Sequence, residues 1–276
     1  MLADISEIIS QSFKLYRGNL ATMLLYGLLF LLLTPMYYIL FFIVALVYGI
    51  LLFSVESTWL YLLITIVLVL GSFILAMAVQ MAVTISFFRR VQNFLGKTPS
   101  HTLPVKSLIF PGILLNILVG SVMFGGPLLL IILGFLFDRW LVMFGGALLL
   151  IIPSIIFVVW FCFAMQELIY ENKRGVKALS SSKDLVAGRW WTIFVRLIAP
   201  PIVFAVAFMA VYMVMGLLFG LIPSDMARLI LIVLANIALS IVFVPLLAIP
   251  PIVLYFSARE NPTVTAPTAA TSGNLV

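Results

Sequence analysis

The side chains that could perform acid–base, nucleophilic or metal chemistry are few in this sequence and lie far apart. His101 is the only histidine, and its place in the polar stretch "GKTPSHTLP" predicts a solvated loop residue. Cys162 is the only cysteine, which excludes an internal disulfide and a cysteine-built metal site. Its apolar neighbours predict a small buried hydrophobic side chain. We expect no cofactor and no metal ion.

The acidic residues avoid the middle of the apolar runs. Glu56, Asp138 and Asp225 fall in the breaks between runs, and Glu167 and Glu171 fall near the end of one run. Aspartyl, serine or metal-dependent chemistry inside a membrane therefore lacks its reacting groups. The patterns G-x-S-x-G and H-E-x-x-H and the phosphate-binding P-loop do not occur in the sequence. We predict a protein that is not an enzyme.

Composition decides the class of protein. Hydrophobic residues make up 65% of the 276 residues, which leaves too little polar surface for a water-soluble domain. Several apolar runs exceed the roughly 18 residues that indicate a membrane-spanning helix, and no segment alternates as a membrane strand would. The sequence predicts an all-α integral membrane protein, a bundle of six spans. The expected spans are residues 20–53, 59–88, 108–136, 140–166, 192–222 and 227–256.

The first run contains Pro35, which could divide it or bend it. The residues before the proline would reach only roughly 20 Å as a helix, too little to cross a hydrocarbon core of about 30 Å. We therefore expect one kinked helix rather than two short ones.

Lysine and arginine are distributed unevenly between the two sides that the six spans define. Thirteen of the 15 lie on one side, and only Arg139 and Arg228 lie on the other. The positive-inside rule places the thirteen in the cytoplasm, together with both termini. The expected location is the cytoplasmic (inner) membrane. The basic side is expected to meet the anionic headgroups of the lipid bilayer, and we expect no nucleic acid partner.

Two segments on the basic side have the pattern of helices that lie in the plane of the membrane. They are residues 1–19 and about 176–191, and residues 259–276 are expected to be a flexible cytoplasmic tail. The N-terminal segment carries one apolar stripe opposite its charged residues. The stripe consists of Leu2, Ile5, Ile9, Phe13, Tyr16 and Leu20.

A tryptophan pair follows the second amphipathic segment. Trp190 and Trp191 are expected where the chain enters the hydrocarbon, because an amphipathic indole ring suits the headgroup level. Arg189 precedes them, and Arg196 can extend back to the same level. We predict these four residues as membrane-interface anchors.

The sequence contains two internal similarities. Ser12-x-x-Leu15-x-x-Gly18-x-x-x-Thr22 matches Ser182-x-x-Leu185-x-x-Gly188-x-x-x-Thr192, and equivalence would imply a parallel repeat. Chance similarity in such a biased composition is the alternative. "VMFGGPLLLII" at 122–132 also recurs as "VMFGGALLLII" at 142–152, on successive antiparallel spans, which indicates close glycine-mediated packing.

Several of these features together resemble a known family. Pro153 inside the fourth span, the pattern Ala178-Leu179-x-x-Ser182-x-x-Leu185-x-x-Gly188-x-Trp190 and the N-terminal "SFKLYRGNLATMLL" carry the resemblance. The chain resembles the membrane domain of bacterial glycerophosphoryl diester phosphodiesterases and its stand-alone six-helix relatives, most of which have no known function. The resemblance implies a six-helix bundle with interfacial helices. It does not imply phosphodiesterase activity, because that chemistry needs metal ligands that the sequence lacks.

Polar residues inside the spans bear on function. Gln80, Asn116 and Asn236 are predicted to bind neighbouring helices, and Gln80 and Asn116 are expected to approach one another. The expected role is a structural, partner-binding or lipid-interacting membrane module. The alternative is a permease or exporter for a neutral or lipid-like solute, which would use such residues to line a path. The sequence also leaves open whether the protein binds a protein partner or forms a homo-oligomer, for which "GLLFG" at 216–220 is a candidate contact face.

Overall fold

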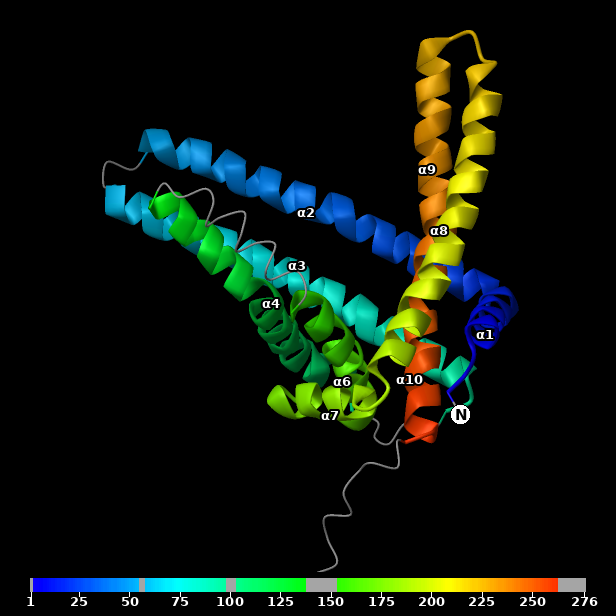
Figure 1. The fold of residues 1–276 in the computed structure, drawn as a ribbon. Helices are drawn as coiled ribbons and strands as arrows, with labels where there is room; N and C mark the ends of the chain where they lie inside the picture. Colours follow the sequence, from blue (N-terminus) through cyan, green and yellow to red (C-terminus); the bar gives the residue numbers. More distant parts are fainter. Residues whose placement is uncertain (1, 55–57, 98–102, 138–152, 263–276) are drawn as a thin grey trace, which may run out of the picture.

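The computed structural model describes residues 2–54, 58–97, 103–137 and 153–262, and every regular element in them is a helix (Figure 1). Six helical segments in this part of the chain are long and apolar enough to cross a membrane, which confirms the expected class. They are Leu20–Val47, Leu63–Phe94, Val105–Met123, Pro153–Glu171, Trp190–Gly220 and Asp225–Glu260. His101, residues 140–152 of the expected fourth span with the second sequence copy, and residues 263–276 of the expected tail lie outside the described residues.

The long helices form two arms (Figure 1). One arm consists of α2 (Leu20–Ser54), α3 (Thr58–Phe94) and α4 (Val105–Leu136), and the other of α8 (Trp190–Gly220) and α9 (Asp225–Ala248). Pro35 lies inside α2, which is one helix, as expected from the length of the first run. The arms diverge from a common end and are joined beside it by packing of α2 on α9.

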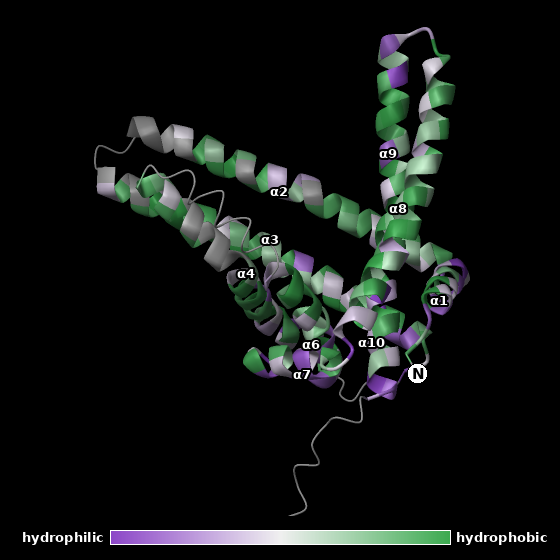
Figure 2. Ribbon diagram, viewed as in Figure 1, coloured by the Kyte–Doolittle hydropathy of each residue, from purple (hydrophilic) through white to green (hydrophobic). Residues whose placement is uncertain are grey.

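Four short helices form that common end, which we call the base. They are α1 (Ile5–Gly18), α6 (Ala164–Glu171), α7 (Val176–Val186) and α10 (Pro250–Glu260). Hydrophilic residues gather on these helices, whereas the arms are mainly hydrophobic along their length (Figure 2). The base is therefore the polar end of an otherwise apolar molecule.

Two of the six membrane-crossing segments are each divided into two helical pieces. In the fourth, residues 153–161 are helical, a turn follows at Cys162 and Phe163, and α6 then begins. In the sixth, α9 ends at Ala248 and α10 begins at Pro250. Pro250 and Pro251 have no N–H to donate to the carbonyls four residues earlier, so the backbone hydrogen bonding of the helix is interrupted there. The expected span over 227–256 is thus present and consists of two helices.

Each amphipathic helix packs beside one of these divided segments: α1 against α10, and α7 against α6. The face of α1 that packs overlaps the predicted stripe only in part: Tyr16 is buried, and Leu2 and Ile9 are partly buried against the core. The buried residues are Ile8, Ser12, Leu15 and Tyr16, whereas Phe13 is 53% exposed. The packed face thus combines part of the predicted apolar stripe with a neighbouring face that includes a serine.

The joint between α7 and α8 also differs from the predicted helix over 176–191. α7 ends at Val186, and Gly188 has a φ of +75°, a left-handed conformation that glycine adopts without strain. The chain turns there, so Trp190 and Trp191 begin α8. Val176, the first residue of α7, is 69% exposed.

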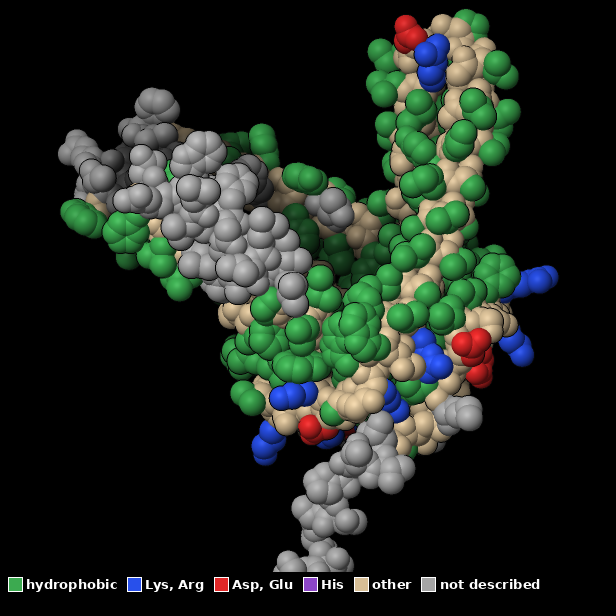
Figure 3. Space-filling model, in the orientation of Figure 1, with side chains coloured by type: hydrophobic (Ala, Val, Ile, Leu, Met, Phe, Trp, Pro, Cys, Tyr) green, Lys and Arg blue, Asp and Glu red, His purple; other side chains and the backbone are tan. Residues whose placement is uncertain are grey.

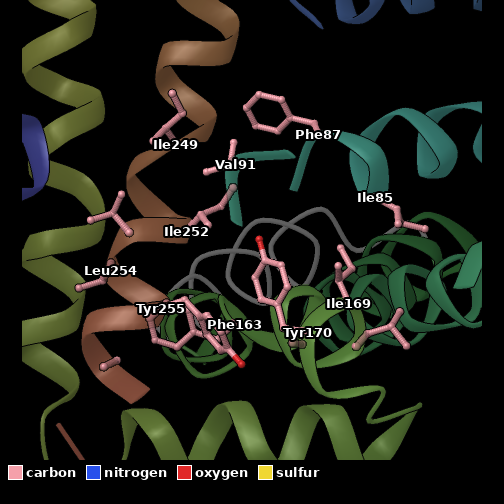
Figure 4. Packing of buried hydrophobic residues seen from close by; sticks show 14 of the residues in the cluster. Ile85, Phe87, Val91, Phe163, Ile169, Tyr170, Ile249, Ile252, Leu254 and Tyr255 are labelled. Atoms are coloured by element: carbon pink, nitrogen blue, oxygen red, sulfur yellow. The ribbon is translucent and has the colours of Figure 1, made fainter. Parts of the chain in front are cut away.

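The buried core lies where the base meets the arms (Figure 4). Phe87 and Val91 of α3, Phe163 of the turn before α6, and Ile252 and Tyr255 of α10 are among its members. The arms join this core near the base and bury little along their most apolar stretches: 6% of that stretch is buried in α8, against 44% in Pro153–Glu171. The arms therefore present their side chains outward, where a bilayer would solvate them.

One glycine permits a close approach between the two arms. A Cβ atom added to Gly27 of α2 would lie 1.9 Å from the carbonyl oxygen of Ile241 in α9. No side chain fits at that distance, so the two helix backbones touch only because this residue is glycine.

Replacing Gly27 by alanine should lower the free energy of unfolding by about 1–3 kcal/mol, because the methyl group forces α2 and α9 apart. The control is Gly49→Ala in the same helix, whose added Cβ meets no atom within 4 Å and should leave stability unchanged. Chemical unfolding in detergent micelles provides the measurement. Equal effects of the two substitutions would contradict the close approach.

Candidate functional site

Glu167 of α6 is a buried carboxylate, with a side chain 1% exposed. Burying a charge costs several kcal/mol unless other groups compensate it. Lys173 Nζ lies 2.8 Å from Oε2, and the Ser181 hydroxyl donates to the same oxygen at 2.7 Å. The Tyr255 hydroxyl donates to Oε1 at 3.1 Å, and Arg259 Nη1 lies 3.7 Å from that atom. Both carboxylate oxygens are thus compensated.

Local backbone geometry brings Lys173 to this position. Asn172, directly after α6, has a left-handed conformation with a φ of 52°, which asparagine tolerates better than most residues. The Lys173 N–H then donates to the Glu167 carbonyl and closes the end of the helix. The lysine side chain is thereby turned back over the carboxylate it neutralises.

α10 joins the same network through two residues spaced one helical turn apart. Arg259 Nη1 donates to the Tyr255 hydroxyl at 2.8 Å, and Arg259 Nη2 lies 2.8 Å from Glu171 Oε2. We call Glu167, Glu171, Lys173, Ser181, Tyr255 and Arg259 the Glu167 cluster. It connects α6, the turn after it, α7 and α10 through charged hydrogen bonds.

Arg189, predicted as an interface anchor, donates to three protein carbonyls. Its Nε donates to Leu185 at 2.9 Å, and its Nη1 and Nη2 donate to Asn261 and to Ala258. The last two carbonyls lie at the C-terminal end of α10, where a positive charge complements the helix dipole. Partial burial lowers the pKa of Arg189. The guanidinium therefore fastens α10 to the joint between α7 and α8.

Ser182 of α7 bridges the interruption in the fourth segment. Its hydroxyl donates to the Trp160 carbonyl at 2.7 Å and accepts from the Phe163 N–H at 3.1 Å. These are backbone groups that the turn removes from the helical ladder. Ser12, its counterpart in the sequence similarity, is equally buried, but its hydroxyl has no hydrogen-bond partner among the described residues.

An aromatic pocket of about 600 Å³ lies beside α7 and the start of α8. Its lining consists of Ile155, Ile156, Trp160, Trp190, Trp191 and Phe194. The Trp190 and Phe194 rings stack with centroids 5.1 Å apart, and Trp191 stands perpendicular to Trp190. The Lys183 ammonium lies 4.8 Å from the centroid of the Trp160 ring, a cation–π contact at the edge of this apolar pocket.

The remaining predicted anchors have different surroundings. Trp191 is 71% exposed, and Trp190 is half-buried against Phe194. Arg196 lies near the start of α1, where it helps to lower the pKa of Asp4, after the larger effects of hydrogen bonds from the Ile5 N–H and the Ser6 hydroxyl. One terminal guanidinium nitrogen of Arg196 is buried without a hydrogen-bond partner in the described part of the chain.

The three predicted intramembrane amides have three separate partners. The Tyr37 hydroxyl donates to Gln80 Oε1 at 2.6 Å, and Asn116 Nδ2 lies 3.7 Å from Met81 Sδ. Asn236 Nδ2 donates to the Ile232 carbonyl of its own helix. Asn116 thus reaches the neighbour of Gln80 in the sequence, and the expected pairing of the two amides is replaced by these contacts.

Sequence reasoning missed the Glu167 cluster. It placed Glu167 and Glu171 at a span end and left them without partners. One signal was available: α6 and α10 each hold ionisable residues four apart, Glu167 with Glu171 and Tyr255 with Arg259. That spacing puts each pair on one helix face. Pairing the two faces required the fold, because they lie 88 residues apart in the chain.

No protein-family model, curated protein or solved structure matches this chain. Within the described residues, no group of three or more His, Cys, Asp or Glu side chains could hold a metal ion. The interpretation of the site therefore rests on its own geometry.

Glu167→Gln should lower the free energy of unfolding by about 2–3 kcal/mol, below the usual cost of breaking a buried pair because Lys173 and Arg259 reach solvent. Glu260→Gln is the matched control. It removes the exposed partner of Lys97 and should cost less than about 1 kcal/mol. Denaturant titration in micelles measures both free energies of unfolding. Equal losses for the two variants would contradict a stabilising role of the buried Glu167 carboxylate.

Ser182→Ala should cost about 1–3 kcal/mol, because the Trp160 carbonyl and the Phe163 N–H lose their shared partner. Ser12→Ala removes a buried hydroxyl that has no partner in the described residues, and should be neutral or stabilising. The same unfolding measurement compares them. A larger loss for Ser12→Ala would contradict the bridging role of Ser182.

Proposed function

We propose that the chain is a non-enzymatic, lipid-interacting module of the cytoplasmic (inner) membrane, with its base and both termini in the cytoplasm. Lysines and arginines cluster at the base, and a smaller charged group marks the tip of the α8–α9 arm (Figure 3). That tip carries the ion pair between Arg228 and Asp225. The uneven charge supports the orientation, because positive residues favour the cytoplasmic side.

The two amphipathic helices support an interfacial role for the base. Phe13 of α1 is exposed, and Lys14 and Arg17 are exposed close to it on the same helix. On the opposite flank of the base, Lys177 and Lys183 of α7 are exposed. An apolar ring beside cationic side chains suits the boundary between acyl chains and headgroups. Each basic residue near such a surface contributes about 1 kcal/mol of attraction to anionic lipid.

The observation that carries the choice of a module over a permease is that the polar residues of the spans have three different partners. Gln80, Asn116 and Asn236 bind a tyrosine, a methionine and a carbonyl of their own helix. A transport path for a polar solute needs such groups to converge on one site. Their partners instead explain them as local contacts that satisfy polar groups within the apolar spans.

One observation favours the second candidate, a permease or exporter for a lipid-like solute. A pocket of about 530 Å³ lies between α2 and α3, and it is mainly apolar. Its lining residues are Tyr37, Tyr38, Leu40, Val44, Val69, Ser72, Phe73 and Ala76. Such a pocket could accept an acyl chain within the membrane.

Reconstitution separates the two functions. We expect the thermal unfolding midpoint to rise when phosphatidylglycerol replaces phosphatidylcholine in the vesicles, and to lose this dependence at high salt. We expect the protein not to accelerate transbilayer movement of a fluorescent lipid above that in protein-free vesicles. A midpoint insensitive to headgroup charge would overturn the module, and accelerated lipid movement would establish the permease.

Cysteine labelling tests the orientation. Ser10 of α1 and Ser180 of α7 are exposed, whereas Ser12 and Ser182 are buried and would report poorly. In a Cys162→Ala background, cysteines at positions 10 and 180 should react with a membrane-impermeant maleimide only after the inner face is opened. A cysteine at Leu221, an exposed residue at the tip of the α8–α9 arm, should react in intact cells. The reverse pattern would invert the topology.

A further inference from the structure

We propose that the aromatic pocket beside α7 and α8 is a specific site for one acyl chain of an anionic phospholipid, with its phosphate held by Lys183. This proposal rests on the lipid-interacting function and names the lipid class and the site. The apolar lining of the pocket includes Trp160, and the Lys183 ammonium lies 4.8 Å from the centroid of that ring.

The shape and chemistry of the pocket fit a hydrocarbon chain. Its volume of about 600 Å³ lies within the range of small-molecule sites, and its lining holds only isoleucine, tryptophan and phenylalanine. The stacked and perpendicular rings of Trp190, Trp191 and Phe194 support one another, so this wall is preformed. A preformed apolar wall binds a chain without the cost of ordering its own side chains.

The depth of the pocket fits the place of an acyl chain below its headgroup. Ile155 and Ile156 belong to the fourth membrane-crossing segment, and Phe194 lies in the first turns of α8. Lys183 lies on α7, at the base. A chain lying against the isoleucines and Phe194 would therefore place its headgroup on the side of α7, which is the level at which phosphate groups lie beside interfacial indole rings.

Lys183 would make the site prefer lipids with a negatively charged headgroup. Its ammonium is fixed over the Trp160 ring, and its contact in the structure is this π face rather than a carboxylate. A cation held by a ring keeps its remaining N–H donors available for phosphate oxygens. Lys177 is also exposed on α7 but does not line the pocket, so it provides a matched control.

The experiment uses bromine in the acyl chain as a contact quencher of indole fluorescence. The chain has five tryptophans, so Trp59→Phe and Trp140→Phe leave Trp160, Trp190 and Trp191, the three that line the pocket. The protein is placed in mixed micelles with brominated phosphatidylglycerol or brominated phosphatidylcholine. The phosphatidylcholine titration measures ordinary annular contact.

We expect brominated phosphatidylglycerol to quench at about fivefold lower mole fraction than brominated phosphatidylcholine, the preference that one basic residue near a membrane contributes. Lys183→Gln should abolish this preference, whereas Lys177→Gln should retain it. Equal quenching by the two lipids, equal effects of the two substitutions, or no quenching would each overturn the site. The protein's unfolding midpoint could still depend on headgroup charge while the two brominated lipids quench these tryptophans equally. That result would rule out this site but not the proposed lipid-interacting function.

Discussion

The charge on Glu167 is the constraint around which the base is arranged. A carboxylate that is 1% exposed must be compensated by neighbouring donors, and α6 alone does not supply them. The required groups come from the turn after α6, from α7 and from α10. Satisfying one buried charge therefore fixes the relative positions of three helices whose apolar surfaces alone would permit several arrangements.

Two other side chains at the base also provide hydrogen-bond partners for polar groups that would otherwise lack them. Arg189 occupies the carbonyls at the end of α10, and Ser182 occupies the backbone groups that the turn in the fourth segment frees. Both residues belong to α7 or to its joint with α8. α7 is thereby fastened to both divided segments, and its position determines where the aromatic pocket and Lys183 lie. The polar contacts of the base thus determine the position of the pocket that we propose binds lipid.

Sequence alone could predict the helical membrane class, because runs such as the one through Pro35 admit no other structure. It also located the amphipathic segments, but the fully buried face of α1 coincides with the predicted stripe only at Tyr16. Hydrophobicity ranks Phe13 above Ser12, whereas the fold buries Ser12 and exposes Phe13. In a membrane protein an apolar residue can face lipid as well as protein, so hydrophobicity does not distinguish the two environments. The polar residues are the better guide to helix contacts, and the partners of Glu167 come from segments too distant in the chain for any local pattern to join them.

Backbone hydrogen exchange with and without the buried charge tests most directly whether Glu167 holds the base together. In the Glu167→Gln protein, amides of both α7 and α10 should exchange faster, because both helices lose their connection to α6. Amides at the tip of the α8–α9 arm should keep their rates, since no contact of the Glu167 cluster reaches them. Unchanged exchange in α7 and α10, or an equal increase along the whole described chain, would show that the base does not depend on this carboxylate.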